Sequence, residues 1–207
     1  MFTTLNSIYF NQTYYLKVNK EYIEGQKYKK ENYSEKALKK GKYEYCTFSD
    51  CIFSNADLSE VDFTECTFER CDFSMAKLRN TAFKEVNFKD CKLLGLRFDD
   101  CNPFLISFNF ENCLLSFSSF FALKLKNTRF DNCKLEEVEF VETDLTNAVF
   151  KNCDLNRAVF DRTKLEGADF RTAFNFSIDP EINQIKKAKF STQNVVGLLH
   201  KHKIIIE

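Results

Sequence analysis

A five-residue period constrains the fold of this chain more than any other feature of its sequence. From residue 115 to residue 170, every fifth position is Leu or Phe, and the two types alternate without a break. The positions are Leu115, Phe120, Leu125, Phe130, Leu135, Phe140, Leu145, Phe150, Leu155, Phe160, Leu165 and Phe170. Such a period fits neither an α-helix, with about 3.6 residues per turn, nor a flat β-strand, with a period of about 2. It indicates a repeat, in which one short unit recurs along the chain.

Each unit divides its side chains between an inner and an outer set. If i is the Leu or Phe position, residues i and i−2 are apolar or small, whereas i−1, i+1 and i+2 are mostly charged or polar. This pattern predicts a backbone that turns one corner per unit. Four corners close a square coil of twenty residues, and Cys113, Cys133 and Cys153 recur at that spacing. Successive coils are expected to stack about 4.8 Å apart through backbone hydrogen bonds.

The alternation also predicts how the core is filled. With four faces per coil, Leu falls on one opposite pair of faces and Phe on the other. The two expected Phe columns are Phe120, Phe140 and Phe160, and Phe130, Phe150 and Phe170. The composition agrees, because 24 Phe residues and no Trp suit an interior that admits one ring at each position.

The units resemble those of the pentapeptide repeat family. Ala56-Asp57-Leu58 and Ala168-Asp169-Phe170 are similar to the A(D/N)LXX unit of that family, as is Ala148-Val149-Phe150. The resemblance extends over roughly three quarters of the chain. It implies an all-β solenoid, a right-handed quadrilateral β-helix, and we expect roughly seven to eight coils with a short C-terminal helix and strand.

The sequence divides into three parts. Residues 1–40 are expected to form an N-terminal cap and weak first coils, residues 41–177 the repeat β-helix, and residues 178–207 a C-terminal cap. The repeat slips near residues 99–114: Phe108 keeps the first frame, and the next clear unit is centred on Leu115. Two extra residues are therefore inserted, which predicts a bulge or a short loop on one face.

Apolar residues in outward phases surround the slip. They are Leu94, Phe104, Phe117 and Phe121. Two interpretations stay open: these side chains cover one another within the bulge, or they form an apolar contact patch for a partner.

The nine cysteines all occupy the i−2 position, which favours a role as small core residues over a disulfide framework. Unpaired thiols predict a reducing compartment, and without a transmembrane span or signal segment in this sequence we expect a cytoplasmic protein that binds no membrane. The two histidines, His200 and His202, lie together near the end of the sequence, with no ligand set placed around them. We therefore expect no metal, no cofactor and no enzymatic activity.

The C-terminal part is predicted to form a homodimer. Val195, Leu198 and Leu199 share one face of the expected helix. The triplet Ile204, Ile205 and Ile206 favours a strand. The open end of a β-helix and such an apolar stripe favour pairing with a second copy through residues 178–207, and the resemblance to dimeric Qnr-type members implies the same.

Acidic residues cluster in two outward groups, although the total charge is balanced at 30 basic and 30 acidic residues. The candidate partner-binding surface comprises Asp57, Glu60, Asp62, Glu65, Glu136, Glu137, Glu139, Glu142 and Asp144. Resemblance to the Qnr-type branch implies a DNA mimic that binds type II topoisomerases (DNA gyrase, topoisomerase IV) and protects them from quinolones. The alternative is an interaction scaffold whose partner is unrelated to topoisomerases. Direct binding of nucleic acid is not expected.

Overall fold

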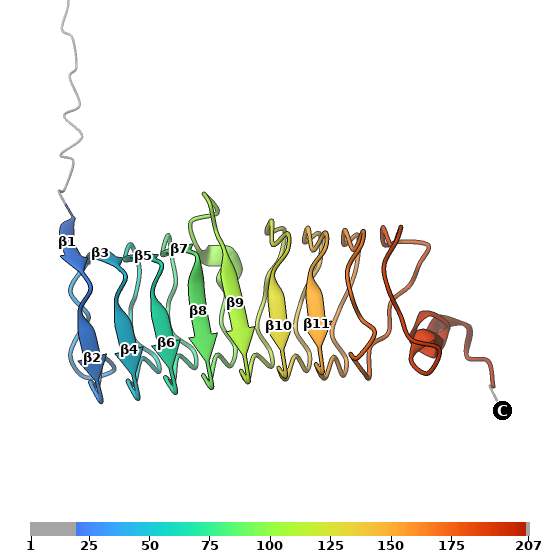
Figure 1. Cartoon of the computed structure of the whole chain (residues 1–207), viewed down its shortest axis with the longest axis horizontal. Helices are drawn as coiled ribbons and strands as arrows, with labels where there is room; N and C mark the ends of the chain where they lie inside the picture. Colours follow the sequence, from blue (N-terminus) through green and yellow to red (C-terminus); the bar gives the residue numbers. More distant parts are fainter. Residues whose placement is uncertain (1–19, 206–207) are drawn as a thin grey trace, which may run out of the picture.

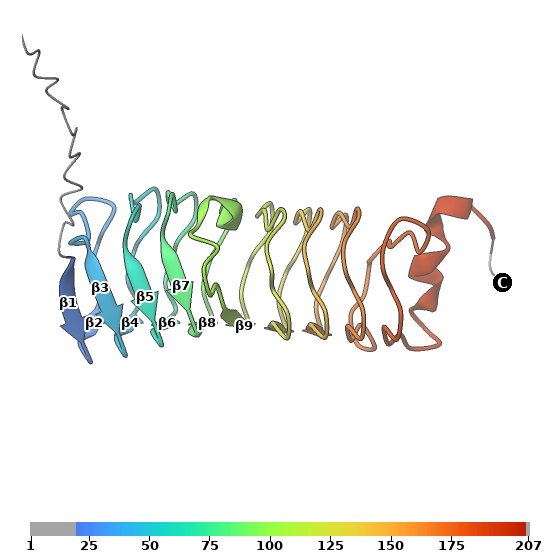
Figure 2. The same cartoon turned by 90° about the horizontal axis from the view of Figure 1, so that it is seen from above.

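The chain forms a straight rod of stacked coils (Figures 1 and 2). This computed structural model describes residues 20–205, so residues 1–19 of the expected N-terminal cap and Ile206 lie outside the described part. Every strand pairs in parallel with a strand of a neighbouring coil, as Tyr43 of β3 does with Phe63 of β5. The predicted all-β solenoid is confirmed, and residues 20–40 form a complete first coil despite their weak repeat pattern.

Two of the four faces carry regular sheets. Face A holds the four-stranded sheet β1 (Glu21–Glu24), β3 (Gly41–Glu44), β5 (Asp62–Thr64) and β7 (Ala82–Lys84). Face B holds the seven-stranded sheet β2 (Lys27–Lys29), β4 (Thr47–Ser49), β6 (Thr67–Glu69), β8 (Val86–Lys89), β9 (Phe108–Glu111), β10 (Arg129–Asp131) and β11 (Val149–Lys151). Isolated parallel bridges continue face A from Lys124 through Asp144 to Lys164 and Gln184.

The other two faces are held by isolated bridges alone. On face C, which follows face B along the chain, Asp72 pairs with Lys92 and Lys92 with Leu114. On face D, Ser119 pairs with Glu139, and Glu139 with Val159. Faces A and C are therefore opposite one another, as are faces B and D.

The corners require left-handed backbone at position i+2. Twenty-six non-glycine residues in the described chain have positive φ, whereas only Gly25, Gly95 and Gly167 do so among the glycines. Asn, Asp and charged residues at these corners point into solvent, and the next coil fixes their backbone: the Asn55 N–H, for example, donates to the Ser74 carbonyl at 3.0 Å. Since this region costs a residue other than Gly roughly 1–2 kcal/mol, the stacked coils must over-determine it.

Aromatic columns fill the core as predicted. Phe120, Phe140 and Phe160 stack at ring-centroid distances of 5.3 and 5.2 Å. Under face B, an unbroken column of stacked rings runs almost the length of the rod, at ring-centroid spacings from 4.6 to 5.5 Å. This column contains Tyr28, Phe48, Phe68, Phe88, Phe110, Phe130, Phe150, Phe170 and Phe190.

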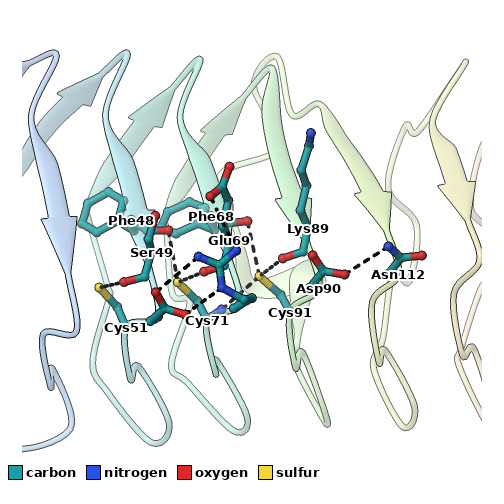
Figure 3. Close-up of polar contacts among 12 residues, drawn as sticks. Phe48, Ser49, Cys51, Phe68, Glu69, Cys71, Lys89, Asp90, Cys91 and Asn112 are labelled. Carbon is teal, nitrogen blue, oxygen red and sulfur yellow. Dashed lines mark hydrogen bonds and ion pairs between the residues drawn. The ribbon is translucent and has the colours of Figure 1, made fainter.

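The i−2 residues do more than leave room for these rings. All nine cysteines are free and buried, and six of them form a column under face C: Cys51, Cys71, Cys91, Cys113, Cys133 and Cys153. Each of these six thiols donates to a backbone carbonyl one coil back, as the Cys71 Sγ does to the Phe48 oxygen at 3.4 Å (Figure 3). The thiols therefore add hydrogen bonds between coils as well as filling space.

The slip lies within the expected range of residues 99–114, but it comes before Phe108 and not after it. Val86 pairs with Phe108 and Phe88 with Phe110, so the offset grows from twenty to twenty-two residues before Phe108. Phe108 thus belongs to the second frame, at its i−2 position, and the extra residues form a loop over 102–107 on face A. A Phe fits at i−2 here because Pro103, in the loop, does not fill the core position that follows Phe83 on face A. The Phe108 ring takes up that space and lies 5.5 Å from the Phe83 ring. A short 3-10 helix, η1 (Phe98–Asp100), precedes the loop.

The C-terminal cap differs from the predicted helix and strand. Two 3-10 helices, η2 (Val195–Leu198) and η3 (His200–His202), stand in place of one regular helix. Asn194 docks them on the last coil, since its side-chain amide donates to the carbonyls of Phe170 and Ala173. Ile204 and Ile205 form no strand, because the chain leaves η3 through a left-handed residue, Lys203, and makes no pairing in the described part.

Candidate interaction surfaces

The predicted acidic residues lie on three of the four faces and on the corners between them. Asp62 and Asp144 are on face A, Asp57 and Glu139 on face D, and Glu136 on face C. The left-handed corner positions hold Glu60, Glu65, Glu137 and Glu142. The structure therefore does not gather the nine carboxylates into one surface. It brings together the group Glu136, Glu137, Glu139 and Glu142, which runs around face D over two corners.

More than half of these carboxylates are paired with a cation. The partner usually lies one coil away, twenty residues along the chain, because outward positions repeat directly above one another. Glu137 pairs with Arg157 at 2.9 Å and Glu142 with Arg162 at 3.0 Å. The remaining pairs are Lys40–Glu60, Lys20–Asp62 and Lys126–Asp144. The charge on these walls is thus largely alternating, and the acidic character is weaker than the sequence clusters predict.

Four of the nine have no ion-pair partner within residues 20–205. Glu139 accepts a hydrogen bond from the Ser119 hydroxyl at 2.9 Å, and Glu136 accepts one from the Asn156 amide. Asp57 accepts the Ser59 N–H at 2.9 Å. Hydrogen bonds from the Ser59 side chain and backbone, together with Lys40 and Lys77, hold the pKa of Asp57 below its usual value. Glu136 and Glu139 thus form no ion pair within residues 20–205, whereas Asp57 lies in the field of Lys40 and Lys77.

The predicted apolar patch is divided between opposite sides of the rod. Phe104 lies at the tip of the face A loop and is 72% exposed. Leu94 is only half-buried on face C, Phe117 occupies the corner between faces C and D, and Phe121 lies on face D. The four residues therefore form no single patch and do not cover one another as a bulge.

Sequence reasoning missed two exposed apolar side chains that belong with these sites. Leu105 is 59% exposed beside Phe104 and has φ of 59°. Met75 is 61% exposed and lies two coils before Phe117 on the same corner. The repeat pattern could have identified Met75, since it is an apolar residue at the outward i+2 position.

At the C-terminal end, the residues of the predicted dimer interface separate into two kinds. Leu198 packs partly against the core, whereas Val195 and Leu199 are exposed. Ile204 and Ile205 are also exposed, Ile205 by 88%. Ile206 lies outside the described residues. An apolar surface thus does remain at this end of the rod.

The described chain offers little for chemistry. Within residues 20–205, no group of three or more His, Cys, Asp or Glu side chains is placed to hold a metal ion. His200 and His202 both lie on η3, and neither belongs to such a group. Burial raises the pKa of the Cys66 thiol to about 12, which is the opposite of what a nucleophile needs. No helix in the described part is long and apolar enough to cross a bilayer.

Comparison with known proteins decides the family. The description "Pentapeptide repeat region" matches residues 41–120 and 104–176, which is well over half of the chain. The chain belongs to the pentapeptide repeat family. Its fold is similar to two solved structures of trypsin-treated QnrB1, titled a plasmid-mediated fluoroquinolone resistance protein. Their TM-scores are 0.58 and 0.59 at 17% and 18% identity, and the matches cover 91% of this chain and 99% and 98% of those chains. No curated protein sequence matches significantly.

Proposed function

We propose that this pentapeptide repeat protein is a non-enzymatic interaction protein that binds a type II topoisomerase, DNA gyrase or topoisomerase IV, in place of DNA, and so protects it from quinolones. The observation that carries the proposal is the match of nearly the whole rod to QnrB1, a fluoroquinolone resistance protein, across 91% of this chain. The shape supports it too, because a straight rod of this kind repeats its outward charges once per coil, at about 4.8 Å.

The surface that we assign to the topoisomerase is the group around face D. Glu136 and Glu139 lie on adjacent faces there and have no cationic partner in the described chain. A basic groove that normally holds DNA would attract them, and this attraction should weaken as salt screens it. The corner glutamates Glu137 and Glu142 would have to exchange Arg157 and Arg162 for cations of the enzyme.

A supercoiling assay with purified gyrase and ciprofloxacin tests this function. We expect the protein at micromolar concentration to restore supercoiling, and Glu136→Gln with Glu139→Gln to weaken that protection by several-fold. The matched control is Glu111→Gln on face B, which removes a carboxylate that pairs with Lys89 instead. If the wild-type protein neither protects gyrase nor inhibits it, the proposed function is ruled out.

A second candidate is a scaffold whose partner is unrelated to topoisomerases. The ion pairing favours it, because five of the nine candidate carboxylates are already neutralised by cations of the same chain. A DNA mimic depends on unpaired negative charge. This candidate predicts that the folded protein neither protects nor inhibits gyrase in the supercoiling assay.

In either role we propose a homodimer through residues 178–207. Its support is the exposed apolar surface of Val195, Leu199, Ile204 and Ile205 at the end of the rod. Light scattering at micromolar concentration in high salt should give twice the chain mass. Leu199→Asp with Ile205→Asp should give the monomer mass, and a wild-type monomer under these conditions would refute this interface.

A further inference from the structure

Face D presents two rows of outward side chains in the coils that follow the loop. One row pairs from coil to coil and contains Ser119, Glu139 and Val159. The other row lies two residues further along each unit and contains Phe121, Val141 and Asp161. Successive members of a row are about 4.8 Å apart, one coil spacing. Val159 and Val141 are therefore near neighbours of Glu139, and Phe121 lies diagonally from it.

The side chains around Glu139 form an apolar surface. Phe121 and Val159 are exposed, and Val141 is half-buried. Phe117 is also exposed and extends this surface over the corner between faces C and D, one coil before Glu137. We call the surface the face D patch and define it by Phe117, Phe121, Val141 and Val159, with Glu139 at its centre.

Glu139 carries the one charge of this region that has no ion-pair partner within residues 20–205. At the corner between faces C and D, Glu137 pairs with Arg157 at 2.9 Å. At the other corner, Arg162 pairs with both Glu142 and Asp161, at 3.0 and 3.2 Å. The face D patch is thus an apolar surface with one unpaired carboxylate, inside a rim of paired charges.

Cations further along face D do not supply the missing partner. Arg97 precedes Ser119 in the same row. Its guanidinium pairs with Asp99 instead, at 2.5 Å. The charge at the centre of the patch therefore stays negative in the described chain.

The Glu139 carboxylate is also held in a fixed direction. The buried Ser119 hydroxyl donates a hydrogen bond to its Oε2 atom at 2.9 Å. The same serine oxygen accepts the N–H of Phe121 at 3.3 Å, which fixes the hydroxyl in turn. Oε1 accepts no hydrogen bond from the described part of the chain. Glu139 therefore offers one free and oriented acceptor.

We propose that the face D patch binds an arginine side chain that a protein partner presents among apolar residues. The guanidinium donates to Oε1 of Glu139 and lies against the ring of Phe121, while the aliphatic part of the arginine packs on Val141 and Val159. This inference deepens the proposed function and rests on its assignment of the partner surface to the group around face D.

The chemistry of the patch selects this occupant. A single unpaired carboxylate requires a cation, and the apolar surroundings strengthen the pair once the partner excludes water. A guanidinium is more weakly hydrated than an ammonium and stacks on aromatic rings, which favours arginine over lysine. A nucleic acid brings neither a cation nor apolar side chains. Buried arginines inside an apolar centre are also typical of the residues that dominate protein interfaces.

A titration with short peptides tests the proposal directly. The probe is the acetylated tripeptide amide leucyl-arginyl-leucine, and methyl NMR of the full chain follows Val141 and Val159. We expect saturable shifts with a dissociation constant of about 1 mM. The lysine analogue should bind several-fold more weakly, and the glutamine analogue about tenfold or more weakly. The proposal is overturned if the arginine peptide gives no saturable shift, or if the glutamine analogue binds equally well.

Variants of the patch separate its two components. Glu139→Gln should weaken binding of the arginine peptide about tenfold, and Phe121→Ser with Val159→Ser should weaken it several-fold without changing any charge. The matched controls are Glu137→Gln in the rim and Ile52→Ser, an exposed apolar residue on face C. Both controls should bind like the wild type. Wild-type affinity in either patch variant would contradict the assignment.

A second copy of the chain is the other occupant that the titration can detect. Shifts of the Val141 and Val159 methyl groups that grow with protein concentration alone, before any peptide is added, would show that copies of the chain cover the patch. That result would overturn the proposal in favour of self-association.

The gyrase assay distinguishes this inference from the proposed function. If the wild-type protein protects gyrase, Phe121→Ser with Val159→Ser should reduce the protection several-fold, and equal protection would overturn the inference alone. If the wild-type protein neither protects nor inhibits gyrase, the proposed function fails, and the peptide titration still decides whether the patch binds arginine. Far-UV circular dichroism establishes that each variant is folded.

Discussion

At the scale of single residues, the two inward positions of each unit have different structural roles. The i position supplies volume, as Phe150 does with no exposed surface. The i−2 position must be small enough to let the chain turn and must satisfy any polar atom that it brings inside. Thr143 and Thr163 do so by donating to the carbonyls of Phe120 and Phe140 at 2.8 Å. Ala, Cys and Thr can therefore all occupy i−2 positions of the rod, because each is compact and none leaves an unpaired donor.

The inward and outward phases predict contrasting mutational costs. Phe150→Ala should lower the free energy of unfolding by about 3–5 kcal/mol, because it leaves a cavity in the longest aromatic column. Ala148→Arg should prevent folding, since Ala148 is fully buried and a charge there has no partner. Glu137→Gln breaks an exposed pair with Arg157 and should cost about 1 kcal/mol or less. Urea denaturation measures all three, and equal tolerance would contradict the assigned phases.

The thiols should be unreactive in the native protein. Burial raises the pKa of Cys66 to about 12, and hydrogen bonding to Cys113 is the largest cause that raises the pKa of Cys91 to about 12. A raised thiol pKa means that the reactive thiolate is scarce below the folded pKa. At about pH 8 the unperturbed thiol, with a pKa of about 8.5, would already be partly ionised. We therefore expect no thiol to react with Ellman's reagent at about pH 8 until denaturant is added, when all 9 should react. Rapid reaction without denaturant would show that the coils open.

At the scale of the coil and its corners, left-handed backbone decides which residues are tolerated. Asn55 has φ of 58° and is exposed at the end of one unit. Asn55→Val should destabilise the protein by about 1–2 kcal/mol, because a β-branched side chain clashes in this conformation. The control Ser54→Val, one residue earlier in the same corner, should change stability much less. The shift in denaturation midpoint distinguishes them, and equal effects would argue against corner strain.

The sequence predicted the coils better than their interruptions. Positions i and i−2 repeat so regularly that the columns, their spacing and their stacking partners followed from the period alone. The slip lies in the predicted range, but Phe108 was assigned to the wrong frame because so bulky a residue was taken for an i residue, whereas the loop opens room for it at i−2. The C-terminal helix was predicted from a stripe of three apolar residues, and the cap instead winds into two 3-10 helices that Asn194 fastens to the last coil.

The candidate surfaces were less predictable because they depend on neighbouring coils. Counting charges along the sequence placed Glu137 in one acidic group with Glu136 and Glu139. The contact that matters for Glu137 is Arg157, twenty residues away. The same offset explains the Arg70–Asp50 pair. Across the loop the offset becomes twenty-two residues, as in the hydrogen bond that the Asn112 side-chain amide donates to Asp90 (Figure 3). Reading outward residues in steps of twenty would have revealed this neutralisation.

At the scale of the whole molecule, the rod is a one-dimensional stack in which each coil contacts only its neighbours. Stability should then depend on whether the columns continue through a junction more than on the number of residues present. Deleting residues 131–150 removes one complete coil and joins Phe130 to Lys151, so that every later residue keeps its face. We expect this protein to fold cooperatively and to lose about 1–3 kcal/mol, the share of about twenty residues.

Deleting only residues 131–135 should be far more damaging, although it removes a quarter as much chain. Every later unit then moves by one face, which sets Leu columns on Phe columns and leaves voids and overlaps in a core that tolerates neither. Urea denaturation followed by circular dichroism compares the two deletions. A five-residue deletion as stable as the twenty-residue one would mean that the coils do not depend on matched columns, because packing within one coil would then be sufficient.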